Sequence, residues 1–497
     1  MKKMCLSLVF GLMVVASLFA KKQPNIVYIF VDDLGYGDVQ VNYPQGKIPT
    51  PNIDQLAAEG IRFTDAHSGA SVCSPSRYGL LTGRQFARED WDNKIGSANN
   101  ACMIEPQQVT VAEYLKEKGY HTACIGKWHV GQTWYSAPGK KHRLSAKTDY
   151  SVPTTDGPND QGFDYFFGLH GASTSSPYTY MRNRLVTVVP TEKGRKDKPA
   201  APGWDFSTIL GTVSDEALNY IDERAQDKET PFFLYFPLTS VHTPIFPAKS
   251  WQGKSEVGWY GDFVMESDWV VGEVLKRLKK HGMDKNTLVI FSSDNGSHGR
   301  ANATHIKPHA VGSAQSHYGH NMNGEWRGVK GDLYEGGHRI PMIIKWPGIV
   351  EPGLVNDDLV MVEDFYATVA DYFNDELGKG VAEDSYSIMP YLKGEKLQEP
   401  IRTYAVLNTF FGYHFIRSGD WVYAPFEGSG GPYNKDGEGG KKSKIPQSEH
   451  VKGQLYNLKT DPKQKHDLWS ENPEKVKELS IMLRQHLKQG HSFGIDR

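Results

Sequence analysis

The sequence predicts an α/β fold: a large mixed, mostly parallel β-sheet flanked by helices, followed by a smaller C-terminal antiparallel sheet with a closing helix. From Pro24 onward, apolar strand-like runs alternate with amphipathic helical runs, which is the pattern of a parallel sheet with helices on both faces. After Leu392 the strand-like runs become shorter, more aromatic and separated by turns. Because 497 residues exceed one ordinary domain, we place two domains, at residues 21–395 and 396–497.

The first elements of the large sheet follow in chain order. The apolar run NIVYIFV predicts a buried strand at Asn25–Val31. The segment TPNIDQLAAEG predicts a helix capped by Thr50, with Pro51 in its first turn and Gly60 at its end. A second helix is expected at VTVAEYLKEKG, and it leads into a strand around HTACIG.

The later elements repeat this order of helix and strand. The helix TVSDEALNYIDERAQ precedes the strand PFFLYF, the helix DFVMESDWVVGEVLKRLKKHG precedes the strand NTLVIFSS, and PMIIKW is a further buried strand. The smaller sheet is expected from TYAVLN, HFIRSG, DWVYAPF and QLYNL. The closing helix begins at Asn472 and Pro473. Its apolar face consists of Val476, Leu479, Leu483 and Leu487.

The first twenty residues differ from the rest of the chain. MKKMCLSLVFGLMVVASLFA has a basic start, an apolar run and a small residue at Ala20, which is the pattern of a secretory signal peptide at residues 1–20. A buried N-terminal helix is the alternative, but it does not account for Lys2 and Lys3. We therefore expect an exported protein, periplasmic or secreted, and no stable membrane anchor, because no other apolar run approaches about 18 residues.

The overall charge of the chain indicates which classes of binding partner to expect. The chain has 56 Lys and Arg residues against 58 Asp and Glu residues, which gives a formal net charge of -2. Nucleic acids and anionic membrane surfaces attract proteins with a basic excess, and this chain has none. The composition therefore predicts no nucleic-acid partner.

The cysteines do not form a disulfide scaffold. Removal of the signal peptide leaves three of them, Cys73, Cys102 and Cys124. Cys102 and Cys124 could form one bridge, or both could be buried thiols. Under either interpretation Cys73 has no cysteine partner.

Polar residues gather where the predicted strands end. In an open parallel sheet the ligand site lies beyond the carboxyl ends of the strands. One aspartate at a strand end is usually a turn or cap residue, but four neighbouring strand ends with chemically useful side chains predict a functional site. These residues are Asp32 and Asp33 after the first strand, Lys127 and His129 after HTACIG, His242 after PFFLYF, and Asp294 and Asn295 after NTLVIFSS.

Four of these residues predict a metal site. Asp32, Asp33, Asp294 and Asn295 supply carboxylate and amide oxygens. Such hard ligands suit calcium or magnesium, whereas zinc more often takes histidine or thiolate. Adjacent buried aspartates also repel each other unless a cation neutralises them. We therefore expect one divalent cation, with calcium preferred over magnesium.

Cys73 does not fit this metal site as a thiol. In SVCSPSRYGLLTGR, Pro75 suits the first turn of a helix that begins just after Cys73, and a helix N-terminus favours an anion such as a thiolate. The phosphatase-type cysteine signature, however, needs arginine six residues after the cysteine, and here residue 79 is glycine while the arginine is Arg77. A thiol is also a poor ligand for a hard cation.

These motifs resemble those of the type I, formylglycine-dependent sulfatases of the alkaline phosphatase superfamily. The stretch from Cys73 to Arg77, continuing to Thr82, Gly83 and Arg84, is similar to the C-x-P-S-R and T-G-R modification signature of that family. The segments NIVYIFVDDLGYGD, GKWHVG, SSDNG, KGDLYEGGHRIPMIIKWPG and LYNLKTDPKQKHDL resemble further family motifs. The resemblance extends from about Asn25 to the closing helix and implies an alkaline phosphatase-like fold.

The resemblance implies a role for each site residue. A formylglycine-generating or other sulfatase-maturing enzyme would oxidise Cys73 to Cα-formylglycine, whose hydrate is the nucleophile and a calcium ligand beside Asp32, Asp33, Asp294 and Asn295. Arg77 and Lys127 would hold the hydrate and the sulfate, and Lys330 would contact the sulfate. His129 would be the base that expels sulfate. His242 would be the general acid for the departing sugar oxygen.

The resemblance therefore predicts a sulfatase, that is, a sulfuric ester hydrolase. Its expected substrate is a sulfated carbohydrate, because the protein is expected to be exported and 12% of its residues are aromatic. We expect exo action, with galactose or N-acetylgalactosamine 6-sulfate as the working choice. The alternatives are a phosphonate or phosphate ester hydrolase of the same superfamily and a non-catalytic protein that binds sulfated glycans with Cys73 unmodified.

Two loops complete the expected site. The loop at residues 168–183 is a candidate for the substrate pocket. The segment after SSDNG is rich in histidine and could be a second metal site, a rim that contacts sugar or sulfate, or a plain polar loop. Its histidines are His298, His305, His309, His317 and His320.

Overall fold

The computed structural model describes residues 22–88, 101–142, 144–145, 147–298, 300, 313–432 and 452–489. The predicted signal peptide at residues 1–20 lies outside the described residues, as do His305 and His309. In the described part of the chain, every helix is too short or too polar to cross a membrane.

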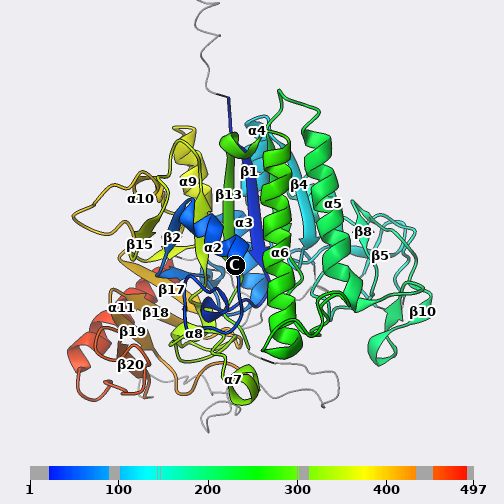
Figure 1. Cartoon of the computed structure of the whole chain (residues 1–497). Coiled ribbons are helices and arrows are strands. Elements are labelled where there is room, and N and C mark those ends of the chain that lie inside the picture. Colours follow the sequence, from blue (N-terminus) through cyan, green and yellow to red (C-terminus); the bar gives the residue numbers. More distant parts are fainter. Residues whose placement is uncertain are drawn as a thin grey trace, which may run out of the picture.

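The large sheet is mixed and mostly parallel, as predicted (Figure 1). It has ten strands in the order β15-β2-β14-β13-β1-β12-β4-β7-β8-β9, and the five from β13 to β7 all run parallel. The parallel strands are β13 (Thr287–Ser293), β1 (Asn25–Val31), β12 (Phe232–Pro237), β4 (His121–Lys127) and β7 (Tyr165–Leu169). The flanking strands are β15 (Leu354–Asn356), β2 (Ile61–Phe63), β14 (Met342–Lys345), β8 (Met181–Arg182) and β9 (Leu185–Val186).

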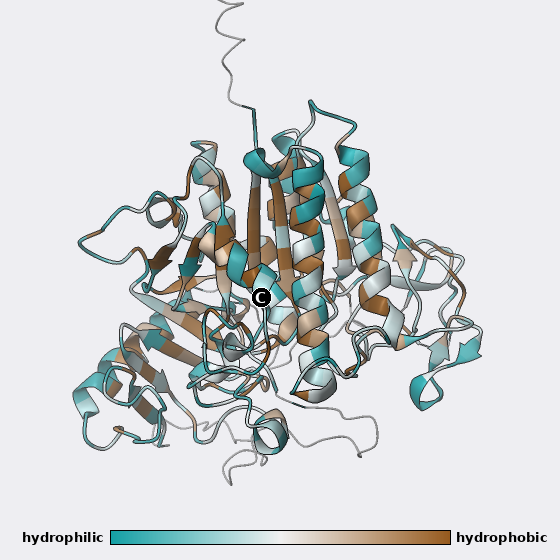
Figure 2. Ribbon diagram, viewed as in Figure 1, coloured by the Kyte–Doolittle hydropathy of each residue, from teal (hydrophilic) through white to brown (hydrophobic). Residues whose placement is uncertain are grey.

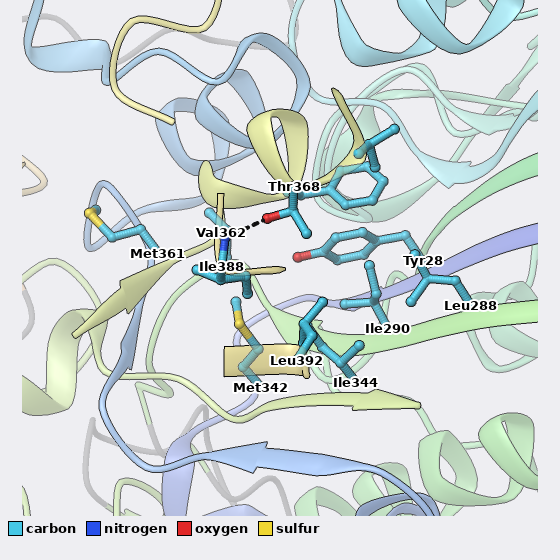
Figure 3. Close-up of a pocket in the computed structure, with 12 residues that line it drawn as sticks. Tyr28, Leu288, Ile290, Met342, Ile344, Met361, Val362, Thr368, Ile388 and Leu392 are labelled. Atoms are coloured by element: carbon cyan, nitrogen blue, oxygen red, sulfur yellow. Dashed lines mark hydrogen bonds between the residues drawn. The ribbon is translucent and has the colours of Figure 1, made fainter. Parts of the chain in front are cut away.

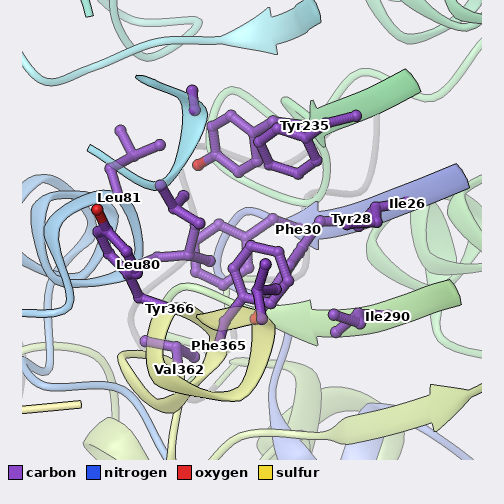
Figure 4. Close-up of a cluster of buried hydrophobic side chains, with 14 of the residues drawn as sticks. Ile26, Tyr28, Phe30, Leu80, Leu81, Tyr235, Ile290, Val362, Phe365 and Tyr366 are labelled. Atoms are coloured by element: carbon purple, nitrogen blue, oxygen red, sulfur yellow. The ribbon is translucent and has the colours of Figure 1, made fainter. Parts of the chain in front are cut away.

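Helices cover both faces of this sheet because its central strands are apolar on both sides. Val27, Ile29 and Val31 of β1 point into one core, which α2 (Pro51–Ala58), α5 (Ile209–Arg224) and α6 (Gly258–Lys280) cover. The alternate residues Tyr28 and Phe30 point into the other core, which α3 (Cys73–Thr82), α4 (Val111–Glu117) and α9 (Asp364–Tyr372) cover. Figure 4 shows this second core, and in Figure 2 the strands are hydrophobic while the outer helix faces are hydrophilic.

A small apolar cavity lies within the second core (Figure 3). It lies between β1, β13, β14 and α9, and its walls include Tyr28, Ile290, Met342 and Phe365. The nearby hydroxyl of Thr368 accepts a hydrogen bond from the backbone N–H of Ile388 at 3.0 Å. Because the walls are ordinary core side chains, we regard this cavity as a packing void and not as a binding site.

The predicted helix ends need small corrections. Thr50 and Asn472 occupy the N-cap positions of α2 and α11 (Pro473–Lys488), but neither side chain caps its helix. The hydroxyl of Thr50 instead donates to Asp54 Oδ1 at 3.1 Å. Helix α2 ends at Ala58, before Gly60, and α3 begins at Cys73 itself and not after it.

The C-terminal region forms the predicted antiparallel sheet with its closing helix. The order is β17 (Tyr404–Asn408), β18 (His414–Ser418), β19 (Trp421–Ala424) and β20 (Gln454–Asn457). Helix α11 packs on this sheet through the fully buried Leu479 and Leu483, while Val476 and Leu487 are partly buried. The placement of a domain boundary between residues 395 and 396 stays a prediction.

Shorter elements connect the two sheets or extend from them. The short helices are η1 (Tyr36–Asp38), η2 (Phe86–Arg88), η3 (Pro158–Asp160), η4 (Arg195–Asp197), η5 (Phe206–Thr208), η6 (Asp284–Asn286), α7 (Ser313–Tyr318), α8 (Glu335–His338) and α10 (Met389–Leu392). The short strands are β3 (Ala66–His67), β5 (Trp134–Ala137), β6 (Lys140–His142), β10 (Glu192–Lys193), β11 (Pro199–Ala200) and β16 (Val360–Met361).

A buried ionic network joins the small sheet to the rest of the protein. Arg417 of β18 donates to both oxygens of Asp65, at 2.6 and 2.7 Å, and to His67 Nε2 at 2.6 Å. Arg339 lies 2.6 Å from Asp65 and donates to Glu335 at 2.8 Å. Burial alone would raise the pKa of Asp65, but the two guanidinium groups outweigh it and hold the pKa well below its usual range.

Replacing Arg417 with alanine should therefore lower the free energy of unfolding by about 3–5 kcal/mol, because it leaves buried carboxylates without a partner. Urea denaturation followed by circular dichroism measures the change. Arg184 is the matched control, since it also forms a bidentate pair, with Asp160 at 2.6 and 2.7 Å, but its side chain is 40% exposed. We expect Arg184→Ala to cost less than about 1 kcal/mol. Equal losses in both variants would contradict the prediction.

Candidate active site

The predicted site residues meet at the carboxyl edge of the large sheet. β1 lies between β13 and β12, and all three run parallel, so their carboxyl ends lie side by side. Asp32 and Asp33 follow β1, Asp294 follows β13, and Lys127 is the last residue of β4. Alternation of buried apolar strands with helices thus delivers these polar side chains to one place.

Two cations lie against the carboxylates of Asp32 and Asp294. Lys127 Nζ lies 2.7 Å from both oxygens of Asp32. Arg77 donates to Asp294 Oδ2 from Nη2 at 2.7 Å and from Nε at 3.1 Å. All four side chains are fully buried. Burial raises the pKa of Asp32 to about 7, although Lys127 and Arg77 oppose the shift.

Lys330 links Asp33 to Cys73. Its Nζ lies 2.5 Å from Asp33 Oδ1 and 3.5 Å from Cys73 Sγ. Burial alone would raise the pKa of Asp33, but Lys330 and His242 outweigh it and hold the pKa well below its usual range. Each site aspartate therefore has a cation beside it, so the repulsion between Asp32 and Asp33 does not by itself require a metal ion.

Cys73 is the first residue of α3 and is 4% exposed. Burial raises the pKa of its thiol, and nearby Lys127 and Lys330 only partly offset the shift. The free thiol is therefore favoured over the thiolate that the helix N-terminus suggested. Cys102 and Cys124 are also free thiols, so the possible bridge between them is not formed.

The donor set fits a divalent cation. Asp32, Asp33, Cys73 and His242 each place one potential ligand atom within 4.8 Å of the others. Asp33 Oδ2 and Asn295 Oδ1 are buried oxygens without a hydrogen bond in the described structure. Asn295 Nδ2 donates to Asp33 Oδ1 at 2.8 Å, which fixes the amide with its oxygen unused. Buried unsatisfied oxygens are costly in the absence of a ligand, so these two point to a cation.

Asp294 is less available for such a cation than the sequence suggested. Its Oδ2 accepts two hydrogen bonds from Arg77, and its Oδ1 accepts the backbone N–H of Asp33 at 3.0 Å. A carboxylate oxygen has more than one lone pair, so Asp294 could still bind a metal ion while it accepts these hydrogen bonds. The ligand role of Asp294 stays a prediction.

The two predicted catalytic histidines flank this cluster. His242 Nε2 lies 3.8 Å from Asp33 Oδ2, and its Nδ1 is 2.5 Å from the carbonyl of Thr243, which turns Nε2 toward the site. His129 has a left-handed backbone with φ of 59°, and its N–H bonds the carbonyl of His170 at 3.1 Å. Burial lowers the pKa of both rings, so the neutral imidazole is favoured.

His298 is a site residue to which the sequence assigned no role. It is 3% exposed, and its Nε2 lies 3.4 Å from Asp33 Oδ2. The signal in the sequence was its position three residues after Asn295. His320 does not join it, because its ring nitrogens bond the N–H of Lys47 and the carboxylate of Asp38. These two histidines therefore do not share a second metal site.

The loop at residues 168–183 contacts both histidine segments. The carbonyl of His170 accepts the backbone N–H of His129, and Ser173 Oγ donates to the carbonyl of Thr243 at 3.2 Å. The loop therefore borders the site and helps to position His129 and His242. Its contact with substrate stays a prediction.

The part of the chain that carries these site residues matches a known family. The model of the family described as Sulfatase matches residues 24–375. The chain belongs to the sulfatase family. It is 31% identical over 504 residues to N-acetylgalactosamine-6-O-sulfatase of Bacteroides thetaiotaomicron, with 93% of each chain covered. This sulfatase is also 31% identical to the N-acetylgalactosamine-6-sulfatase of Mus musculus, over 78% of this chain and 69% of the mouse protein.

Solved structures confirm the fold of this sulfatase. A structure from a study of the metabolism of multiple glycosaminoglycans by Bacteroides thetaiotaomicron superimposes with a TM-score of 0.79 at 29% identity, covering 94% of this chain and 100% of the other. The phosphonate monoester hydrolase of Agrobacterium radiobacter superimposes with a TM-score of 0.60 at 16% identity, covering 94% of this chain and 96% of the other, which shows a shared fold alone. The chain is a sulfuric ester hydrolase of the alkaline phosphatase-like superfamily.

Proposed function

We propose that this sulfatase removes the 6-sulfate from a terminal N-acetylgalactosamine or galactose of a sulfated glycan. The observation that carries the reaction is the buried cluster in which Lys330 lies 2.5 Å from Asp33 and 3.5 Å from Cys73. The sugar and the sulfate position are supported by the two relatives that act as N-acetylgalactosamine 6-sulfatases, at 31% identity.

Cys73 is the proposed attachment point of the nucleophile. After oxidation to Cα-formylglycine by a sulfatase-maturing enzyme, its hydrate would supply the attacking oxygen. This proposal is supported by the sequence CSPSR at the start of α3 and by the raised pKa of the free thiol, which disfavours a thiolate nucleophile. The maturing enzyme would act before folding is complete, because Cys73 is buried in the folded chain.

The cations would hold the sulfate group. Lys127, Arg77 and Lys330 converge on the site from β4, α3 and the segment before α8. Preorganised cations in a buried site stabilise the charge that builds up on the sulfate oxygens in the transition state. Their carboxylate partners fix them in place before substrate arrives.

Asp32, Asp33, Asp294 and Asn295, with the modified Cys73, would hold one calcium ion. The unused oxygens of Asp33 and Asn295 support this assignment. Bound calcium would supply Lewis-acid polarisation at the oxygens it contacts. Magnesium is less suitable because it requires a stricter octahedral geometry.

His129 and His242 would move protons. His129 favours the neutral ring, which is the form that accepts a proton, and so would act as the base that expels sulfate. His242 would donate a proton to the departing sugar oxygen. Burial lowers the pKa of the His242 ring, and Asp33, 3.8 Å from its Nε2, offsets this only in part, so the ring would have to take up a proton before this step.

A desulfation screen over defined saccharides tests the substrate. With matured enzyme we expect kcat/KM for terminal N-acetylgalactosamine or galactose 6-sulfate to exceed that for the 4-sulfates by at least about 100-fold, because the wrong isomer leaves buried polar groups unpaired. Saccharides with only internal sulfates are the control for exo action. Preference for another sulfate position would overturn the assignment, and good turnover of phosphonate esters with negligible sulfatase activity would favour the rival hydrolase.

A further inference from the structure

A basic hairpin projects from the protein at residues 192–200. It consists of β10, η4 and β11, and it carries four exposed cations within six residues. The only acidic side chains in the hairpin are Glu192 and Asp197. Within the described part of the chain, no carboxylate lies within 4 Å of any of these cations, so their charges remain available. The four cations are Lys193, Arg195, Lys196 and Lys198.

The hairpin is anchored to the loop that borders the active site. Tyr178 of that loop donates its N–H to the carbonyl of Pro199 at 2.9 Å, and its own carbonyl accepts the N–H of Ala201 at 2.8 Å. Gly194 lies directly against the ring of Tyr178, where a Cβ would come within 2.8 Å of a ring carbon. The start of the same loop holds His129 through the carbonyl of His170. The hairpin is therefore continuous with the wall of the site.

A row of aromatic rings connects the hairpin with the His242 segment. The ring of Tyr178 meets that of Phe206 edge-on at 5.1 Å, and Phe206 stacks on Phe246 at 5.8 Å. Phe246 lies four residues beyond His242. Phe206 and Phe246 are half-buried, so they contribute apolar surface between the site and the hairpin.

The hairpin and the site lie toward the same end of the sheet. β1 enters at the top of Figure 1 and runs downward to its carboxyl end, and β10 lies in the lower right part of the view. Helices α5 and α6 begin close to the aromatic row, at Ile209 and Gly258, and run upward from this end. A glycan chain that leaves the active site on this side would pass the aromatic rings before it reaches the cations.

We propose that the hairpin at residues 192–200 binds the anionic part of a glycan that extends beyond the sulfated sugar being cleaved. This inference rests on the proposed function and extends its substrate from a single sulfated sugar to a polyanionic oligosaccharide. The exposed cations attract sulfate or carboxylate groups, and the aromatic rings provide faces for the intervening sugars. Because these contacts lie away from the reacting sulfate, they lower KM and leave kcat unchanged.

The test removes the charges and compares long with short substrates. The hairpin variant is K193A/R195A/K196A/K198A, and a charge-retaining variant is K193R/K196R/K198R. The matched control, K276A/K279A/K280A/K285A, removes the same number of exposed cations at the opposite end of α6 and in the following η6. KM and kcat are measured with a chondroitin 6-sulfate oligosaccharide and with N-acetylgalactosamine 6-sulfate at low and high salt.

The hairpin variant should raise KM for the oligosaccharide about tenfold at low salt, with kcat and the monosaccharide kinetics unchanged within about twofold. The difference should shrink at high salt, because exposed charges are screened. The charge-retaining variant and the control should behave like the unaltered enzyme. An unchanged KM in the hairpin variant, or equal losses on both substrates, would overturn the proposal.

A binding measurement separates this proposal from the proposed function. Isothermal titration of the oligosaccharide into Cys73→Ala protein needs no catalysis, so it reports on the hairpin even if the 6-sulfate assignment fails. We expect the four hairpin substitutions to weaken binding about tenfold in this background. Hairpin-dependent binding to vesicles of anionic phospholipid that is as tight as binding to the oligosaccharide would overturn the glycan assignment in favour of a membrane surface.

Discussion

Replacement of Cys73 with alanine is expected to lower sulfate ester hydrolysis by about five orders of magnitude, because it removes the proposed attachment point of the nucleophile. Cys73 is buried, but alanine removes only its sulfur atom and so leaves a small cavity, and the fold should be retained. The cations around residue 73 would still bind the sulfate group of the substrate. We therefore expect kcat to collapse while substrate binding, measured by isothermal titration, persists.

Cys102→Ser is the matched control for this substitution. Cys102 is a free thiol that is only partly buried and packs beside the core that contains α4. Its replacement should leave kcat within about twofold of the unaltered enzyme. Activity in Cys73→Ala comparable to that of this control would contradict the role of residue 73. So would mass spectrometry of fully active enzyme that found residue 73 entirely as a thiol.

If the proposed calcium ion is bound, its removal with a chelator is expected to lower kcat about 1,000-fold and to lower the melting temperature by several degrees. The first effect would follow from loss of the Lewis-acid polarisation that a bound calcium ion would supply. The second follows because an ion that binds only the folded chain stabilises it by mass action. Added calcium should restore both quantities, whereas magnesium should need a much higher concentration. Full activity after exhaustive chelation would contradict a metal site.

Variants of two asparagines test which residues hold the ion. Asn295→Ala removes a buried amide oxygen that has no hydrogen bond, so it should raise the calcium concentration needed for half-maximal activity and for half of the thermal stabilisation. Asn159→Ala is the control, because the amide of Asn159 bonds the backbone carbonyl of Phe163. An equal calcium requirement in the two variants would contradict the ligand role of Asn295.

Local patterns in the sequence were sufficient for the fold class and for most of the candidate site. Short apolar runs and their periodicity predict the buried strands and the helices between them. These patterns involve only residues that are close together in the chain. The polar residues after Val31, Lys127 and Ser293 could therefore be assigned to one edge of a parallel sheet. The antiparallel C-terminal sheet and the buried face of α11 followed from the same kind of pattern.

The local sequence was not sufficient to predict helix capping or the pairing of the cysteines. Thr50 has the right residue type and position for a cap, yet its hydroxyl bonds Asp54. Whether Cys102 and Cys124 form a bridge depends on the distance between them in the fold, and both remain thiols. A polar side chain can form hydrogen bonds with several possible partners, and the fold determines which of them lies within reach.

The sequence by itself determined that this protein carries carboxylates, cations and a cysteine at the carboxyl edge of an α/β sheet. Only the tertiary structure decided which of them pair. Lys127 neutralises Asp32 across 95 positions of the chain, Lys330 reaches Asp33 across 297 positions, and His298 lies against the same aspartate. The physical reason is that a buried charge is stable only beside a partner of opposite charge. Which partner lies beside it is determined by the path of the whole chain.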